Sequence, residues 1–193
     1  HRPSLLLYAK VDSTEHALIR SEVTATVQRI LVRDGQSVRK GQLMVQLASK
    51  QLQYHLQEYQ GMEKELFSRV QQEVYHVNYQ KKLITKETTL LKLQRAEYQR
   101  KQKLFKRGHL SKQDLDRSHS SLLSQQTQFE AAKNRLMILE NQLAQFKAKL
   151  QQTQARVNRA QDSIDKCMIK SPYNGVVTSL NVATGQSLSS GAA

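Results

Sequence analysis

The side chains that most often carry out chemistry are thinly spread along this 193-residue chain, which holds six histidines and one cysteine. The histidines are His1, His16, His55, His76, His109 and His119. Cys167 has no second cysteine with which to form a disulfide bond, and no histidine or cysteine stands near it at the spacing of a zinc site. His55 and His76 are expected to be surface residues of a helix. We therefore predict no metal site.

Other catalytic arrangements are also missing from the sequence. Catalysis needs a nucleophile with its base, a metal cluster or a carboxylate pair held in a pocket. The chain shows none of these patterns, nor the glycine-rich loop that binds phosphate groups. We therefore predict a non-enzymatic protein with no catalytic residues.

The chain is strongly basic, with a formal net charge of +14 from 30 lysines and arginines against 16 acidic residues. Nucleic acid, an anionic membrane or an acidic protein surface would each attract such a chain. Acidic residues are interleaved with the basic ones, as in residues 63–65 and 114–117, so most of the charge is expected on solvated helix faces. A basic coiled coil that binds nucleic acid, and a cytosolic scaffold, are the alternative interpretations. A zipper that reads nucleic acid would concentrate its charge in one helix, which argues against the first.

The elements that must position any functional residue are dominated by a helical hairpin, predicted over residues 49–167. Residues 49–107 contain no proline and only one glycine, Gly61. Apolar residues recur every seven positions as Val70, Val77, Ile84, Leu91, Tyr98 and Phe105, with Leu83, Leu90 and Leu104 beside them, so that one face is expected to be apolar throughout. A second series is Leu115, Leu122, Phe129, Leu136, Leu143, Leu150, Val157 and Ile164. Such heptads predict a coiled coil, and the short break between the helices makes it antiparallel.

The tip of the hairpin is predicted at about residues 106–112. Arg107, Gly108 and His109 interrupt the first helix. Ser111 is a good N-cap for the second helix, with Asp114 in its first turn.

Strand-like segments flank the hairpin at residues 21–48 and 168–193, and they resemble each other. The run Asp34–Gly41 matches Thr184–Gly191, with apolar residues aligned at the same offset upstream. Turns are predicted at Gly35, Gly41, Gly175 and Gly185. The repeat predicts two related β-halves that pack face to face.

Taken together, these segments resemble the periplasmic adaptors, or membrane fusion proteins (HlyD-like), of Gram-negative tripartite efflux pumps and type I secretion systems. Residues 27–47 and 169–177 carry the resemblance. It implies an elongated α+β fold in which a long antiparallel coiled-coil hairpin is inserted between the two halves of a lipoyl-like, or barrel-sandwich hybrid, β-domain. Residues 1–20 would then be a remnant of an adjoining β-barrel domain, and the chain is expected to be part of a longer protein.

The same resemblance implies a function at the hairpin tip. Arg100, Leu104 and Ser111, with Gly108 in the turn, stand at the spacing that the family uses to dock a TolC-like outer-membrane channel. The expected partners are that channel, an inner-membrane transporter of the ABC or another exporter class, and further copies of the chain in a ring, with no nucleic acid. The expected location is the periplasm, with an inner-membrane anchor outside this sequence. Drug, metal and protein export all stay open as the cargo.

No cofactor is predicted. Lipoyl and biotinyl domains carry their cofactor on a lysine in the turn that joins the two halves, and here the hairpin replaces that turn. Lys50 and Lys166 lie near the junctions, but nothing around them resembles a modification site. We therefore expect neither lipoate nor biotin.

Overall fold

A computed structural model of the protein describes residues 17–191. Its contacts divide the chain into two compact units. The β-domain unit is formed by the chain up to His55 and again from Arg159, and the hairpin unit is Leu56–Asn158. Of the barrel remnant predicted at residues 1–20, residues 1–16 lie outside the described part, and residues 17–20 belong to no strand. The predicted division into domains therefore stays a prediction at that end.

The β-domain is built from six short strands of the described chain. They are β1 (Ala25–Ile30), β2 (Ser37–Val38), β3 (Leu43–Leu47), β4 (Met168–Lys170), β5 (Gly175–Val176) and β6 (Ser187–Leu188). Four form an antiparallel sheet in the order β4-β3-β1-β6, and β2 pairs with β5. Three of these pairings, β1 with β6, β3 with β4 and β2 with β5, join the first half to the second. The halves therefore share hydrogen-bonded sheets, a closer association than the face-to-face packing that the repeat predicted.

An internal symmetry relates the two halves, in which residue n corresponds to residue n + 150. The backbone N–H of Gly35 donates to the carbonyl of Val177 at 2.7 Å, and that of Gly185 donates to the carbonyl of Val27 at 2.8 Å. A second pair of bonds obeys the same rule. The N–H of Gly41 donates to the carbonyl of Ser171, and that of Gly191 donates to the carbonyl of Ser21, both at 2.7 Å. The repeat found in the sequence is therefore also a repeat of hydrogen bonds, and each half completes the other.

Three of the four predicted turn glycines adopt a backbone conformation that other residues avoid. The φ angles of Gly35, Gly41 and Gly185 are +78°, +81° and +86°. Gly175 differs, because it begins β5 opposite Val38 and has no positive φ. The bend comes just before it, at residues 172–174, where the Asn174 side chain accepts a 2.8 Å hydrogen bond from the backbone of residue 40.

Both halves contribute to the core of the β-domain. Its buried members are Val27, Val32, Val38, Met44, Val45, Leu47, Cys167 and Leu188. Neither half alone supplies enough apolar side chains to exclude water, so both halves are needed to form the core.

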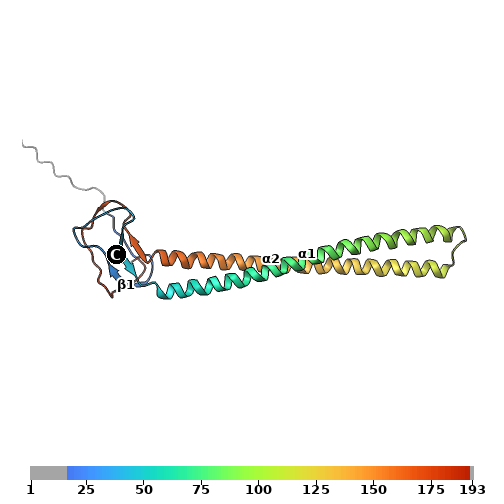
Figure 1. Cartoon of the computed structure of the whole chain (residues 1–193), viewed down its shortest axis with the longest axis horizontal. Coiled ribbons are helices and arrows are strands. Elements are labelled where there is room, and N and C mark those ends of the chain that lie inside the picture. The colour runs from blue at the N-terminus through green and yellow to red at the C-terminus, as the bar shows by residue number, and fades with distance from the viewer. Residues whose placement is uncertain (1–16, 192–193) are drawn as a thin grey trace, which may run out of the picture. The chain divides into compact units, whose positions relative to one another are not determined.

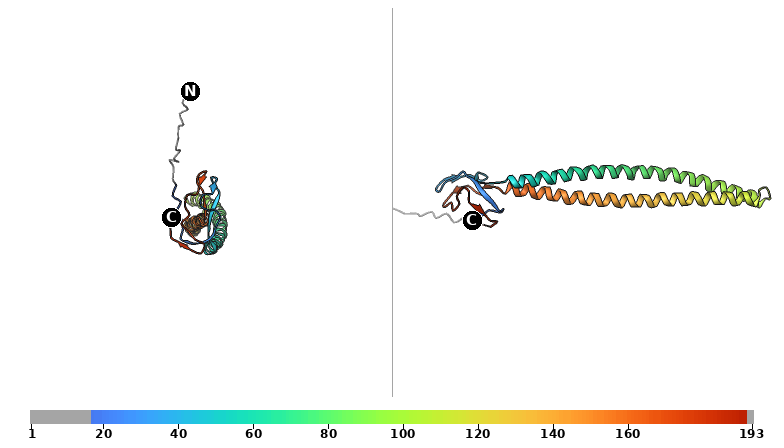
Figure 2. Two further views of the ribbon diagram at one scale, coloured as in Figure 1. Left: turned by 90° about the vertical axis from the view of Figure 1, so that its left-hand side faces the viewer. Right: turned by 90° about the horizontal axis from the view of Figure 1, so that it is seen from below.

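The hairpin consists of α1 (Lys50–Lys106) and α2 (Lys112–Asp165). Figures 1 and 2 show the two helices running side by side and antiparallel, and in Figure 1 they cross as they wrap around each other. We call the residues by which they touch the seam. Its first row, every seventh residue from Val70 in α1 and from Leu115 in α2, includes the buried Val77 and Leu122. The predicted hairpin inserted between two β-halves is confirmed.

The second row of the seam in α1 is polar. Its central members are Glu73, Gln80, Glu87 and Gln94. Nε2 of Gln80 donates to the carbonyl of Ala132 at 3.0 Å, and Nε2 of Gln125 donates to Glu87 Oε2 at 2.5 Å. The flanking Leu90 and Leu104 lie on the surface, 47% and 38% exposed. The expectation that one face of α1 is apolar throughout is therefore wrong for this row, because hydrogen bonds across the seam take the place of apolar contacts.

Candidate functional site

Two backbone hydrogen bonds end α1 at the hairpin turn. The backbone N–H of His109 donates to the carbonyl of Leu104 at 3.0 Å, and that of Gly108 donates to Phe105 at 2.9 Å. These two bonds form a Schellman motif, which requires a left-handed residue at its C′ position. Gly108 occupies that position with a φ of +75°, so the turn depends on this glycine.

The start of α2 is fixed by its N-cap, as the sequence predicted. The hydroxyl Oγ of Ser111 accepts a hydrogen bond from the backbone N–H of Asp114 at 3.1 Å and donates to the carboxylate of the same residue at 2.6 Å. One orphan N–H of the first helical turn is thereby satisfied. Because α1 and α2 are both capped, the connecting residues 107–111 have little freedom.

The predicted docking residues all reach the surface of this turn. Arg100 and Leu104 are exposed and lie four residues apart, so they share one side of α1. Ser111 is exposed directly after the turn. A charged fork, an apolar side chain and a hydroxyl that is bonded to Asp114 are thus exposed near this end of the hairpin. Such groups suit recognition of a protein surface that offers carbonyl or carboxylate oxygens beside an apolar patch.

The charge around the turn is strongly positive. Its basic residues are Lys101, Lys103, Lys106, Arg107 and Lys112. Acidic neighbours offset part of this charge, since Glu97 forms a 2.9 Å ion pair with Lys101 and Asp114 is bonded to Ser111 in the first turn of α2. The hydrogen bond from Lys101, its charge and the charge of Arg100 lower the pKa of Glu97, so this carboxylate stays ionised. The net field at the turn remains positive.

One contact at this end of the hairpin was not predicted. The rings of Tyr98 on α1 and His119 on α2 stack with centroids 5.1 Å apart and planes 28° from parallel. The heptad spacing places Tyr98 in the seam, but nothing in the sequence singles out His119. Only the register of the two helices could have revealed the pair.

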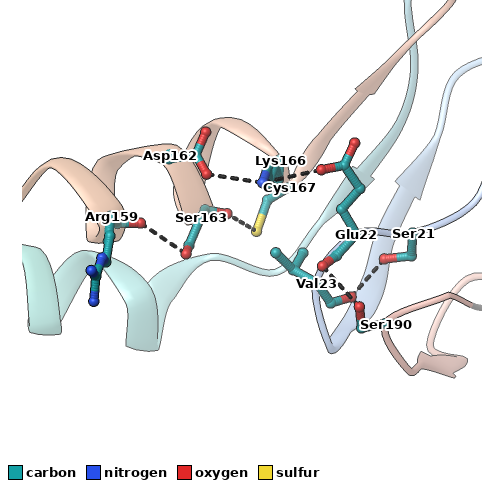
Figure 3. A network of polar contacts seen from close by, with 9 residues as sticks. All are labelled: Ser21, Glu22, Val23, Arg159, Asp162, Ser163, Lys166, Cys167 and Ser190. Atoms are coloured by element: carbon teal, nitrogen blue, oxygen red, sulfur yellow. Dashed lines mark hydrogen bonds and ion pairs between the residues drawn. The ribbon is translucent and has the colours of Figure 1, made fainter. Parts of the chain in front are cut away.

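A second polar cluster ties the end of α2 to the first β-half, inside the β-domain unit (Figure 3). Lys166 Nζ lies 2.9 Å from Asp162 Oδ2 and 3.1 Å from Glu22 Oε2. Hydrogen bonds to Asp162 and then to Glu22 raise the pKa of Lys166. One of the two lysines near the junctions, Lys166, is thus held in two ion pairs.

The described residues also bear on metal binding and on membrane insertion. Residues 17–191 contain no group of three or more metal-ligating side chains that could hold an ion. None of the helices in that part of the chain combines the length and the apolar character needed to cross a membrane.

Comparison with known proteins places this geometry in a family. Residues 15–193 match the family described as CzcB-like, barrel-sandwich hybrid domain. The chain belongs to this family. That confirms the predicted membership among membrane fusion, or periplasmic adaptor, proteins, and these are not enzymes.

Individual relatives are distant. The chain is 24% identical to the macrolide export protein MacA of Escherichia coli O157:H7 and to that of Shigella flexneri, over 96% of this chain and 42% of each relative. It therefore spans less than half the length of these curated relatives. Among solved structures it is similar to the periplasmic adaptor protein EmrA, with a TM-score of 0.54 and 12% identity over 93% of this chain and 70% of that one. At that identity the likeness concerns the fold alone.

Proposed function

We propose that this chain is the hairpin and barrel-sandwich part of a periplasmic adaptor that links an inner-membrane transporter to a TolC-like outer-membrane channel, for efflux or secretion. The protein would be anchored to the inner membrane through a segment outside this sequence and would assemble as a ring. It performs no chemistry in this role. Its contribution is to hold a docking surface in place.

The observation that supports the proposal is a capped turn with three exposed side chains beside it, those of Arg100, Leu104 and Ser111. The Schellman motif around Gly108 and the N-cap at Ser111 fix the backbone at Leu104 and Ser111, and Arg100 stands one turn earlier on α1. A preorganised turn loses little conformational freedom when a partner binds it. Family membership supports the proposal, because it makes the hairpin part of an adaptor.

The charge of the turn supports an acidic partner surface. Five basic residues gather within residues 101–112, and Glu97 neutralises only one of them. Complementary charge raises the rate at which partners meet and penalises wrong partners. A channel whose mouth is lined with carboxylates is the partner that this field favours.

The proposal is tested by site-specific photo-crosslinking in cells that produce the full-length protein. The photoreactive residue is placed at position 100, 104 or 111, and the captured protein is identified by mass spectrometry. We expect an outer-membrane channel from all three positions. Asn78, exposed on α1 away from the turn, serves as the matched control position and should capture no channel.

A second variant separates docking from stability. Ser111→Asn keeps a good N-cap but replaces the hydroxyl, whereas Ser111→Ala removes both. If docking uses the hydroxyl, both variants lose capture and export while only Ser111→Ala loses helix stability. Recovery of nucleic acid or a cytosolic protein from positions 100, 104 and 111 would overturn the proposed function.

A further inference from the structure

The half of α1 that leads to the turn, green in Figure 1, carries more positive charge than docking at the turn explains. Between residues 82 and 106 there are eight basic and two acidic residues, so this stretch carries six of the fourteen net positive charges of the chain. Lys82 and Lys92 lie about 39 Å and 24 Å from Gly108 along the helix axis. A partner that contacts the turn alone leaves these two lysines without a role.

The positive side chains of this stretch point away from α2. Counted from the seam row of Val70 and Val77, the outward positions of each heptad are the second, third and sixth. We call the eleven outward positions from 82 to 106 the cationic stripe, and every one of them is exposed. The stripe contains no acidic residue, and its cations are Lys82, Lys86, Lys92, Arg100, Lys103 and Lys106.

The two carboxylates of the same stretch are already occupied within the hairpin. Glu87 accepts a hydrogen bond from Gln125 across the seam, and Glu97 pairs with Lys101 at 2.9 Å. None of the six stripe cations forms an ion pair with any residue between 17 and 191. The stripe therefore keeps its full charge for a partner.

Outward faces elsewhere on the hairpin are mixed in charge or neutral. The outward positions of α1 from 50 to 79 carry two lysines and two glutamates. Those of α2 from 120 to 155 carry one charged residue, Glu130, which pairs with Lys133 at 3.3 Å. The cationic stripe is therefore not the ordinary solvated surface of this hairpin.

The stripe also destabilises its own helix. Lys82 and Lys86 stand four residues apart, and Lys103 stands three residues from both Arg100 and Lys106. Like charges at these spacings repel each other on the surface of a helix. An anionic ligand bound along the stripe would remove that repulsion, so ligand and helix would stabilise each other.

The length of the stripe selects a long ligand. Lys82 and Lys106 lie about 36 Å apart along the helix axis. A small anion contacts one or two of the cations, whereas a linear polymer of anionic groups can contact all six. Each contact releases counterions, which favours binding at low salt.

The neutral polar residues of the stripe favour a polymer of sugars. The hydroxyls of Thr85 and Thr89 each donate to the carbonyl four residues earlier, at 3.1 Å. Their remaining lone pairs can therefore accept hydrogen bonds, but the hydroxyls have no further proton to donate. Sugar hydroxyls supply such donors, whereas the phosphates of DNA and the carboxylates of an acidic peptide only accept.

Apolar side chains beside the cations fit the same ligand. Tyr79, Lys86, Leu93 and Arg100 follow one another at intervals of seven residues, so exposed apolar and cationic side chains alternate along one row. Tyr79 and Leu93 are 54% and 62% exposed. The C–H face of a sugar ring can cover such a side chain while a carboxylate of the same polymer pairs with the neighbouring cation.

We propose that the cationic stripe of α1 binds an acidic polysaccharide, a linear polymer of sugars that carries carboxylate groups. The lysines and the arginine pair with the carboxylates, and the threonine oxygens accept from sugar hydroxyls. This inference goes beyond the proposed function and does not rest on it. Arg100, Lys103 and Lys106 also lie near the turn, so the test uses the other three cations.

The test measures binding of the purified chain to fluorescently labelled oligogalacturonate, a linear sugar polymer with a carboxylate on each ring, by fluorescence anisotropy. One variant replaces half of the stripe cations, by Lys82→Gln, Lys86→Gln and Lys92→Gln. Helix propensity hardly changes, so the fold is kept. We expect the Kd to rise at least about tenfold and the dependence of log Kd on log salt to fall to roughly half.

A matched control makes the same change at three exposed lysines outside the stripe, Lys64, Lys147 and Lys170. Its net charge equals that of the first variant, and its Kd should stay within about twofold of the parent value. Equal losses in the two variants, or no binding by the parent chain, would contradict the proposal. Neither channel nor transporter is present, so this result and the capture of a channel at the turn can fail separately.

A further variant tests the sugar itself. Thr85→Val with Thr89→Val keeps the branched shape and removes both acceptor oxygens. It should weaken binding to oligogalacturonate about fivefold and leave binding to polyglutamate, which has carboxylates but no sugar hydroxyls, unchanged. Equal losses for the two ligands would overturn the assignment to a polysaccharide. So would single-stranded DNA of the same charge if the parent chain bound it as tightly as oligogalacturonate.

Discussion

Gln80 and Ala132 are joined across the hairpin by a 3.0 Å hydrogen bond from the glutamine side chain to the backbone carbonyl of the alanine. The glutamine is only 9% exposed, in a seam position that coiled coils usually give to an apolar residue. Ala132 lies inside α2, where its carbonyl also accepts the helical bond of its own chain. The side-chain bond is therefore an addition that the helix does not need.

This relationship predicts opposite effects for two substitutions. Gln80→Leu should raise the free energy of unfolding by about 1 kcal/mol, because it buries apolar surface and strands no polar group. Gln80→Ala should lower it by about 1 kcal/mol through the lost bond and the space left behind. Urea denaturation followed by circular dichroism at 222 nm measures both. A destabilised Gln80→Leu would mean that the hydrogen bond outweighs apolar packing at this seam.

The hairpin turn predicts that glycine is required at only one of the two glycine positions in residues 50–112. Gly108→Ala should destabilise the hairpin by about 1 kcal/mol, because a φ of +75° strains any residue with a Cβ atom. Gly61→Ala, in the exposed interior of α1, should instead stabilise it by about 0.8 kcal/mol through helix propensity. Thermal denaturation of the two variants compares them directly, and equal effects would show that the Schellman turn is not rigid.

The internal symmetry predicts equal losses at equivalent positions. Gln36 Oε1 accepts from the backbone N–H of Arg33 at 2.9 Å, and Gln186 Oε1 accepts from that of Ala183 at 2.9 Å. Gln36→Ala and Gln186→Ala should each lower the free energy of unfolding by about 1 kcal/mol. The corresponding Gln→Glu variants retain the acceptor oxygen and should cost less. Losses that differ by more than twofold between the two sites would show that the symmetry of bonds is not a symmetry of energies.

The ion pairs of Lys166 predict a loss of stability at alkaline pH. Hydrogen bonds to Asp162 and Glu22 raise the pKa of Lys166 above its usual value of 10.5. A raised pKa means that the folded state binds the proton more tightly, so the stabilisation is complete below pH 10.5 and is lost as the pH rises through the folded-state pKa. Lys166→Gln should therefore be less stable than the parent at pH 8, and the difference should vanish at strongly alkaline pH. A difference that persists there would assign it to packing of the lysine side chain.

Much of the fold could be predicted from the sequence because it depends on patterns of neighbouring residues. Heptads spaced from Val70 and from Leu115 predicted both helices, and Gly108 and Ser111 marked where one ends and the other begins. The turns at Gly35 and Gly185 were recognisable from the repeat, since each sits at the same place in a matching run. Each of these patterns is formed by residues that lie close together in the sequence.

What escaped prediction depends on partners far away in the sequence. A glutamine such as Gln80 looks like a surface residue until the register places Ala132 opposite it. The stack of Tyr98 on His119 is hidden for the same reason. Strands as short as β2 and β5 carry too little pattern to show that each pairs across the two halves.

The polar second row of the seam makes the cohesion of the hairpin uneven along its length. Continuing the register of the Gln80–Ala132 bond, Leu66 lies level with Phe146, whereas nearer the turn Glu87 is bonded to Gln125 and Gln94 lies level with Ser118. The hydroxyl of Ser118 is buried without a hydrogen-bond partner. A sideways load at the turn would therefore separate the polar layers well before the apolar ones. We therefore expect the hairpin to bend more easily near the turn than further from it.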